Sequence, residues 1–257
     1  MTKGDGATAP VERPSPNQGP RRGGARADMV VLHYTGMSDC AGALDRLCDP
    51  SAEVSAHYVV DLNGRIFALV PESARAWHAG VAAWGAVTDV NSRSIGIEIV
   101  NPGHELGHPP FPEPQMLAVE RLLAGILERH AIAPERVVGH ACVAPGRKRD
   151  PGEKFDWRRL ARAGLSVWLD ADDTAQPDGP ADPAAFRDAA RRFGYPVGEG
   201  AGWDDALRAV WASFAMRFRP ADAARGALPG RAALRHLERL AASWPVAPER
   251  ASSISAD

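Results

Sequence analysis

The chain has 257 residues, of which 45% are hydrophobic and 24% are charged, and its formal net charge is -2 at pH 7. This length is enough to bury one good core and to leave material for a small accessory domain. The near-neutral charge, without a basic stripe interleaved with aromatic residues, argues against a nucleic-acid partner. No stretch approaches the roughly 20 apolar residues that cross a bilayer, so we predict no membrane span.

The cysteines and the first residues indicate a compartment. Cys40, Cys48 and Cys142 fit neither a CxxC zinc module nor a disulfide framework, so we interpret them as ordinary thiols in a reducing compartment. The first 28 residues lack the apolar stretch, roughly 7 to 15 residues long, that a secretory signal requires. The sequence therefore predicts a cytoplasmic location, with the periplasm as the alternative, and we expect a monomer.

Residues 1–27 are rich in proline, glycine and arginine and hold few apolar side chains, so we predict a flexible N-terminal arm. The apolar run 29–33 then has the pattern of a buried strand. Two further strand-like runs, 56–61 and 65–70, are joined through Asn63-Gly64, a dipeptide suited to the positive φ angles of a tight hairpin turn.

Residues 94–100 alternate in the manner of a strand with one buried face. Its isoleucines share the face that we expect to point to the core, while Gly96 and Glu98 share the other, where the glycine would leave room for a ligand. The apolar spacing over 114–130 is helical, and a short strand over 136–139 precedes His140. Strands that alternate with helices predict an α/β fold with a mixed central sheet flanked by helices, here over residues 28–169.

The remaining residues have a different character. An acidic, proline-containing linker is predicted over 170–182. Helical patterns follow at 183–193, 204–218 and 229–244, and they predict a small three-helix bundle over 183–245 with a flexible tail over 246–257. A bundle of this size is near the lower limit for folding alone.

Three residues have the chemistry of metal ligands. His33 ends the first strand, His140 ends the last one, and Asp150 lies in the loop ten residues further on. A catalytic zinc ion needs three protein ligands and one open position for water, and two histidines with one aspartate would supply that set. Each residue alone is weak evidence for a metal site, because a histidine at a strand end is usually structural and an aspartate before proline usually forms a turn.

Two charged residues are candidates for catalysis. Glu98 projects from an otherwise apolar strand, so it needs either a positive partner or a function, such as a general base acting on water. Lys148 precedes Asp150 by two residues, and in an extended loop both would point to the same side. Its ammonium would then stabilise an oxyanion. The simpler alternatives are a salt bridge for Glu98 and a solvated surface lysine for Lys148.

The segment Trp77-His78-Ala79 is a candidate substrate-binding loop. An aromatic face suits a sugar ring, and His78 would donate a hydrogen bond to a substrate carbonyl or to the attacking water. As an isolated sequence, such a segment is more often a packing feature. His57 lies inside a strand, and we interpret it as a core or supporting histidine, because a fourth ligand would close the open position on the metal.

Five ordered segments between residues 28 and 168 carry a family resemblance. They are VVLHYTG (30–36), SAHYVVD (55–61), AWHAG (76–80), NSRSIGIEIVNPG (91–103) and VVGHACVAPGRKRDPG (137–152). Together they resemble the type 2 N-acetylmuramoyl-L-alanine amidases, zinc enzymes related to peptidoglycan recognition proteins.

The resemblance implies roles for the candidate residues. His33, His140 and Asp150 fall on the zinc ligands of the family, Glu98 on its catalytic glutamate and Lys148 on its transition-state lysine. The segment over 76–80 is similar to the substrate-contacting loop of the broad-specificity branch, which accepts ordinary and 1,6-anhydro muramyl ends. The C-terminal helices resemble a peptidoglycan-binding bundle. One departure is Cys142, which stands where an aspartate commonly follows the second zinc histidine by two residues and would support it.

The expected function is therefore zinc-dependent hydrolysis of the amide bond between the lactyl group of N-acetylmuramic acid and L-alanine, in cell-wall turnover or recycling. Two alternatives stay open from sequence. One is a non-catalytic peptidoglycan-binding or sensing protein, and the other is an amidase that acts on a different amide.

Overall fold

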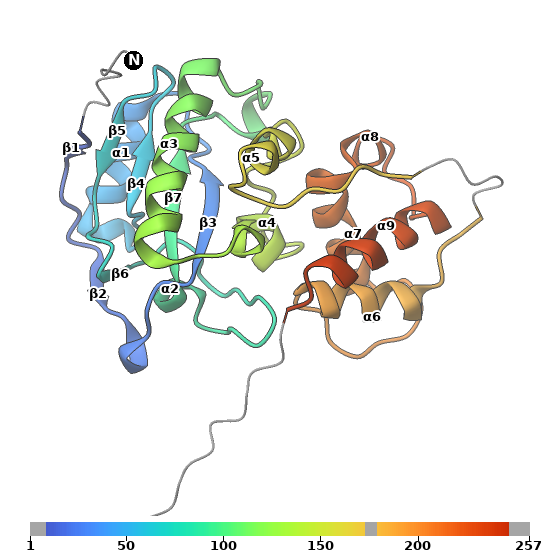
Figure 1. The fold of residues 1–257 in the computed structure, drawn as a ribbon. Helices are drawn as coiled ribbons and strands as arrows, with labels where there is room; N and C mark the ends of the chain where they lie inside the picture. Colours follow the sequence, from blue (N-terminus) through green and yellow to red (C-terminus); the bar gives the residue numbers. More distant parts are fainter. Residues whose placement is uncertain (1–8, 173–178, 247–257) are drawn as a thin grey trace, which may run out of the picture.

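The computed structural model describes residues 9–172 and 179–246 and is built around a six-stranded sheet (Figure 1). The strands are β1 (Val11–Glu12), β3 (Met29–Tyr34), β4 (Tyr58–Val60), β5 (Ile66–Ala68), β7 (Ser94–Ile99) and β8 (Val137–Gly139). Their order is β1-β5-β4-β7-β3-β8. β4, β7, β3 and β8 are parallel, and β5 returns antiparallel to β4 through the predicted hairpin turn, where Gly64 has a φ of 84°. The expected mixed α/β sheet is confirmed.

One face of the sheet is covered by a long helix. The helices of this part of the chain are α1 (Cys40–Cys48), α2 (Val90–Arg93), α3 (Glu113–His130), α4 (His140–Val143) and α5 (Trp157–Arg162). In Figure 1, α3 lies across the near face of the sheet, and its apolar stripe packs on the isoleucines of β7, as the alternation of that strand predicts. Short 3-10 turns lie at 22–24, 50–52, 104–106 and 134–136.

On the opposite face, the part of the sheet at β3 and β8 packs against the C-terminal helices, whereas β4 packs with α1. The C-terminal helices are α6 (Pro183–Phe193), α7 (Asp205–Phe218), α8 (Pro220–Ala223) and α9 (Arg231–Ser243). The three predicted helices are therefore present, with α8 as a short addition. Met29 and Val31 of β3 belong to the same buried cluster as the apolar residues of these helices. The bundle thus shares a core with the sheet instead of closing on one of its own.

Hydrogen bonds fix α7 to the segments on both sides of His140. The Ser213 hydroxyl donates to the carbonyl of Ala141 at 2.6 Å, and the buried Arg217 guanidinium donates to the carbonyl of Val137 at 3.2 Å. These bonds join α7 directly to β8 and α4. The helical region therefore supports the segment that carries a candidate ligand.

The predicted flexible arm over residues 1–27 is wrong for the residues that the structure describes. β2 (Gln18–Pro20) pairs antiparallel with β6 (Ala74–Ala76), and β1 pairs with β5. The Arg21 guanidinium then donates to backbone carbonyls of two other segments, those of Glu72 and Ser94 among them. Hydrogen bonds from the backbone and from side chains hold this segment in place. Its low hydrophobicity therefore did not indicate flexibility. Residues 1–8 lie outside the described part of the chain.

The linker and the tail fall partly beyond the described residues, which leave out 173–178 of the predicted linker and 247–257 of the predicted tail. Val246, the first residue of that tail, donates its N–H to the carbonyl of Arg192 and packs against the core. Within the described ranges, no helix combines the length and apolar character needed to cross a bilayer.

Candidate metal centre and active site

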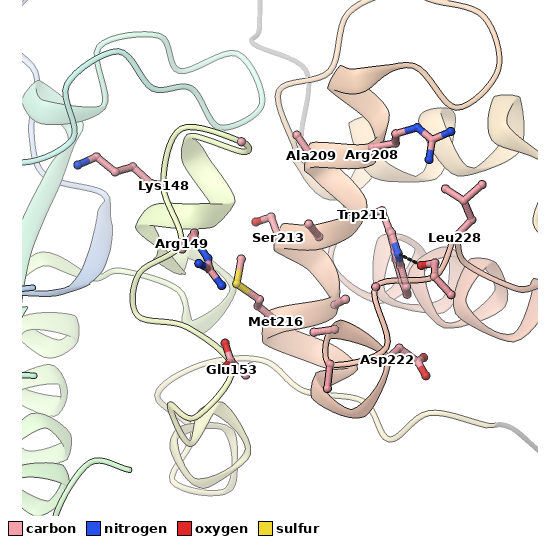
Figure 2. A pocket seen from close by; sticks show the side chains of 17 residues that line it. Lys148, Arg149, Glu153, Arg208, Ala209, Trp211, Ser213, Met216, Asp222 and Leu228 are labelled. Carbon is pink, nitrogen blue, oxygen red and sulfur yellow. Dashed lines mark hydrogen bonds between the residues drawn. The ribbon is translucent and has the colours of Figure 1, made fainter. Parts of the chain in front are cut away.

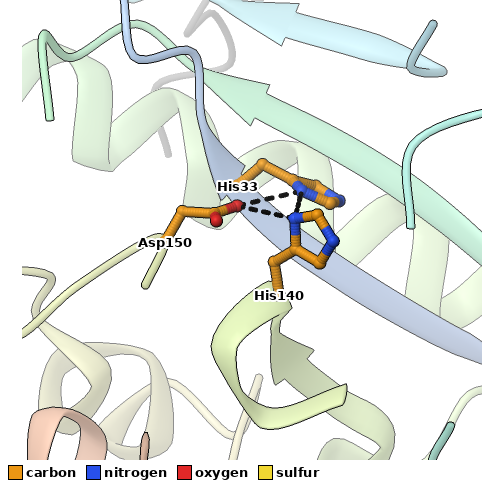
Figure 3. A group of neighbouring side chains, drawn as sticks. All are labelled: His33, His140 and Asp150. Atoms are coloured by element: carbon orange, nitrogen blue, oxygen red, sulfur yellow. Dashed lines mark hydrogen bonds and ion pairs between the residues drawn. The ribbon is translucent and has the colours of Figure 1, made fainter. Parts of the chain in front are cut away.

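The parallel strands bring the candidate residues to one edge of the sheet. In the register of β3 and β7, His33 lies beside Glu98, and β8 lies on the other side of β3 and ends at Gly139, immediately before His140. Since the carboxyl ends of parallel strands meet at the same edge, residues more than 100 positions apart in sequence become neighbours there. Asp150 reaches the same place from the loop after α4 (Figure 3).

Three buried ligand atoms form a nearly equilateral triangle. His33 Nδ1 lies 2.9 Å from His140 Nδ1 and 3.1 Å from Asp150 Oδ2, and His140 Nδ1 lies 3.0 Å from the same oxygen (Figure 3). All three residues are at most 6% exposed. The structure therefore brings together the three residues predicted as metal ligands.

The partners of the outer ring nitrogens determine where the protons lie. The Ser94 hydroxyl donates to the carbonyl of Val90 at 2.6 Å and so accepts from His78 Nε2 at 3.1 Å. His78 Nδ1 then accepts from His33 Nε2 at 3.0 Å, which leaves His33 Nδ1 without a proton. Burial also lowers the pKa of His33 to about 4, so the ring is neutral at pH 7.

His140 is oriented in the same way by a backbone carbonyl. Its Nε2 donates to the carbonyl oxygen of Ala79 at 3.1 Å, so its Nδ1 also carries a lone pair. Burial alone would raise the pKa of Asp150, but contacts with His140 and His33 hold it below its ordinary value. Two lone pairs and a carboxylate oxygen thus converge with no hydrogen-bond donor between them, an arrangement that a cation satisfies.

The ligand set fits a zinc ion. Nitrogen and oxygen ligands of zinc lie about 2.0–2.2 Å from the metal, so tetrahedral ligands are about 3.3–3.5 Å apart. The triangle of His33, His140 and Asp150 comes within about 0.6 Å of that spacing. With three protein ligands, a tetrahedral ion keeps one position for solvent or substrate.

Glu98 and Lys148 line the same cavity as His140 and Asp150. This cavity has a volume of about 390 Å³ and is bordered also by Tyr34, Trp77 and Arg149. Part of the Glu98 residue reaches solvent, but its Oε2 is shielded and has no hydrogen-bond partner within residues 9–172 and 179–246. Burial and the charge of Asp150 raise the pKa of Glu98, which Lys148 opposes. A carboxyl group with a raised pKa beside a metal site is suited to accept and return a proton.

Residues 23–153 match the family model described as N-acetylmuramoyl-L-alanine amidase. The chain belongs to this family. It is an enzyme that hydrolyses the amide bond between N-acetylmuramic acid and L-alanine in peptidoglycan fragments.

Relatives and solved structures agree with this assignment. The N-acetylmuramoyl-L-alanine amidase AmiD of Escherichia coli is 38% identical over 213 residues, which cover 76% of each chain. A structure of that enzyme with anhydro-N-acetylmuramic acid-L-Ala-D-gamma-Glu-L-Lys superposes with a TM-score of 0.75 at 34% identity, covering 93% of this chain and 92% of the other. AMPDH3 of Pseudomonas aeruginosa, in complex with anhydromuramic pentapeptide, has a TM-score of 0.75 at 32% identity and covers 96% of this chain and all of its own.

In this amidase the three residues of the predicted substrate loop, Trp77, His78 and Ala79, have different surroundings. Trp77 is half-buried and lines the cavity. His78 has both ring nitrogens engaged, by His33 and Ser94, so the expected hydrogen bond from it to substrate has no free nitrogen to make it. Ala79 is fully buried and acts through its carbonyl on His140.

The expected free space above Gly96 is also absent, because the His78 ring fills it. A Cβ built on Gly96 would lie 2.4 Å from Cγ of that ring. His57 is fully buried, accepts from the Gly96 N–H at 2.9 Å and is within 3.2 Å of the carbonyl of Ala74. Its interpretation as a core histidine agrees with this position.

Sequence reasoning missed two supporting residues. Arg147 donates to the carbonyls of Ala79 and Val81, and it thereby holds the backbone that orients His140. Ser94 begins the hydrogen-bond chain to His33. In the sequence, Arg147 is a charged residue beside Lys148, and Ser94 is the polar first residue of a strand. Such features are too common to indicate a supporting role.

Among the described residues, the polar neighbours of the Cys142 thiol are C-terminal residues and not the candidate metal ligands. Its Sγ lies 3.8 Å from the Tyr195 hydroxyl and 3.9 Å from the buried Arg217 guanidinium, on the side of the helical bundle. The support that an aspartate at this position was expected to give to His140 comes instead from the carbonyl of Ala79.

A second and larger cavity, about 600 Å³, lies between the 146–153 loop and the α7–α8 region (Figure 2). It contains none of the three candidate metal ligands, and we place the chemistry in the smaller cavity for that reason. Lys148 and Arg149 border both cavities. Figure 2 shows the Lys148 side chain directed away from α7, whereas Arg149 extends towards Met216.

Proposed function

We propose that this amidase is a zinc enzyme in which His33, His140 and Asp150 hold the ion, Glu98 transfers the proton and Lys148 stabilises the oxyanion. The observation that carries the proposal is the convergence of three buried acceptor atoms with no donor among them. The family resemblance of these positions supports the same assignment. When bound, the zinc ion would polarise the scissile carbonyl and lower the pKa of water towards neutrality.

The protein side chains then divide the remaining work. Glu98 accepts a proton from the attacking water and returns it to the amine of L-alanine as the bond breaks. Its shielded Oε2 has no competing hydrogen-bond partner in the part of the chain that the structure describes, which keeps the carboxylate available. The Lys148 ammonium donates to the oxygen that becomes negative in the tetrahedral transition state. Trp77 offers an aromatic face to the muramyl ring.

The test separates metal binding from proton transfer. Glu98→Gln should keep the zinc content of the parent protein while turnover of a muropeptide falls about 10²- to 10⁴-fold. Removal of metal with a chelator should abolish turnover, and added zinc should restore it. The matched control is Glu12→Gln, at an exposed residue distant from Glu98 in the sequence, and it should leave turnover unchanged. Parent-like turnover in Glu98→Gln would remove Glu98 from the mechanism.

We also propose that anhydro-muramyl peptides are substrates, since two relatives were solved with such ligands. Mass spectrometry of products from anhydro-muropeptide and from intact sacculi, offered in parallel, tests this. Release of stem peptide from sacculi alone would restrict the enzyme to the polymer.

The helical bundle is proposed to hold the part of the substrate that extends beyond the scissile bond. The support is the cavity between it and the catalytic loop, which shares Lys148 and Arg149 with the active site. Ala224→Trp, at an exposed position lining that cavity, should raise the KM for sacculi and leave the KM for a minimal muropeptide unchanged. Equal KM values for sacculi in parent and variant would argue against this role.

The cytoplasmic location and the monomeric state stay predictions from the sequence. Cell fractionation with antibody detection tests the first, and light scattering coupled to gel filtration tests the second.

A further inference from the structure

A second group of ligand-type side chains lies next to the active site. His104 and His108 come from the turn after β7, and Glu153 follows Asp150 by three residues. The ligand atoms of these three side chains all lie within 4.8 Å of one another. The proposed catalytic chemistry uses none of them.

One atom at the centre of this group, His108 Nδ1, is buried and makes no hydrogen bond to any residue that the structure describes. The His108 Nε2 lies 3.0 Å from the carbonyl of Pro151, and because a carbonyl only accepts, that nitrogen carries the proton. In the neutral form of the ring the other nitrogen, Nδ1, is an acceptor, and it lies 3.5 Å from Glu153 Oε1. His108 is 2% exposed. A buried acceptor facing a carboxylate is unfavourable unless a cation or a proton lies between them.

The His104 ring is placed in a similar way, with one nitrogen facing Glu153 and the other facing a different polar group. His104 Nε2 lies 2.9 Å from Glu153 Oε2, and its Nδ1 lies 2.9 Å from the Tyr34 hydroxyl. The rings of His104 and His108 stack at 4.4 Å with an interplanar angle of 26°. Thus each ring directs one nitrogen towards the carboxylate and has a polar partner on the other nitrogen. Histidines that bind metals show this pattern, because the outer partner fixes the ring.

The backbone is shaped to bring these rings together. His108 has a φ of 39°, a left-handed conformation that few residues other than glycine adopt. Gly152 has a φ of 82°, and a Cβ there would lie 2.4 Å from His108 Cε1 and 2.9 Å from His104 Cε1. The close approach of the 104–108 turn to the 151–153 segment therefore depends on local conformations that cost free energy. Strain of this kind is typical of ligand-binding positions.

We propose that His104, His108 and Glu153 bind a second divalent transition-metal ion, through His104 Nε2, His108 Nδ1 and a carboxylate oxygen of Glu153. Two imidazoles and one carboxylate suit zinc and its neighbours in the first transition row, and zinc is the probe for the test. The ion would tie the 104–108 turn to the segment that continues from Asp150. It would also fix Tyr34, which adjoins His33 and borders the active-site cavity.

The experiment counts zinc in the full-length protein. Each protein is stripped with a chelator, dialysed against buffered zinc near neutral pH and analysed by inductively coupled plasma mass spectrometry. The parent should retain two equivalents, and Glu153→Gln should retain one. His140→Ala should also retain one, and the double variant none. His130→Ala removes an imidazole outside both clusters and should retain two.

Several outcomes distinguish this proposal from the catalytic one. A parent with one equivalent, unchanged by Glu153→Gln and lost in His140→Ala, would overturn the second site and leave an ion-paired cluster. A parent whose zinc depends on Glu153 but not on His140 would instead overturn the catalytic assignment. His108→Ala, checked for folding by circular dichroism, should reproduce the loss seen in Glu153→Gln. If the protein is loaded with cobalt(II) instead, absorption weaker in His108→Ala and in Glu153→Gln than in the parent would show that the lost ion had protein ligands.

Discussion

Residue 96 must be glycine, because a side chain there would displace His78, which supports the candidate metal ligand His33. In Gly96→Ala the new Cβ would lie 2.4–2.7 Å from three atoms of the His78 ring, where ordinary contacts begin at 3.4 Å. The ring must therefore move by about 1.0 Å, the difference between 3.4 and 2.4 Å, because residue 96 lies in the central strand β7 and cannot retreat. Such a shift breaks the 3.0 Å hydrogen bond between His78 and His33 Nε2.

The magnitude follows from two costs. Overpacking a buried site costs about 1–3 kcal/mol, and the lost hydrogen bond adds about 1 kcal/mol. The free energy of unfolding should thus fall by about 2–4 kcal/mol. Loss of the group that orients a metal-bound histidine weakens metal affinity about 10- to 100-fold.

Urea denaturation and zinc competition with a chromophoric chelator measure the two effects. Gly198→Ala is the control, since a Cβ there meets no atom within 4 Å, and it should change neither quantity. Adding His78→Ala to Gly96→Ala removes the clash and should recover the overpacking part of the lost stability, but not the zinc affinity. Zinc affinity equal to that of the parent in Gly96→Ala would refute the supporting role of His78.

Two further predictions concern stability. Arg21→Ala leaves carbonyls such as those of Glu72 and Ser94 without their donor. The free energy of unfolding, measured with urea, should therefore fall by about 2–4 kcal/mol. The control is Arg22→Ala, at a side chain that is 74% exposed, and it should change this free energy by less than about 0.5 kcal/mol. Hydrogen bonds, first that from Arg129, outweigh burial and lower the pKa of Glu72 from 4.5 to about 2. Because the folded pKa is the lower one, the contribution to stability is complete above pH 4.5 and is lost as the pH falls to about 2. The Tm difference between parent and Glu72→Gln should therefore shrink over that range, and a constant difference would contradict the linkage.

Local patterns in the sequence were sufficient for several elements. The turn at Asn63-Gly64 and the alternation of β7 depend on neighbouring residues only, since φ preferences and the period of a strand are local properties. The apolar stripe of α3 is equally local. These elements appear where they were predicted.

Elements held by distant partners were not predictable in this way. β2 and β6 are three residues each and pair across more than 50 positions, so neither has a recognisable pattern of its own. The wrong prediction of a flexible arm has the same cause, because backbone carbonyls far along the chain hold Arg21. The cluster of His104 and His108 with Glu153 was also missed. Its one local sign was the spacing of two histidines in a glycine-flanked turn, while the carboxylate lies 45 positions beyond His108.

The sequence by itself determined the α/β class and the identity of the candidate ligands, because residue types and their order carry that information. Only the tertiary structure decided which atoms of those residues meet and which nitrogens carry protons. The tautomer of His33 depends on His78 and Ser94, and that of His140 on the carbonyl of Ala79. These partners come together through strand register and loop packing, which no single stretch of the chain encodes.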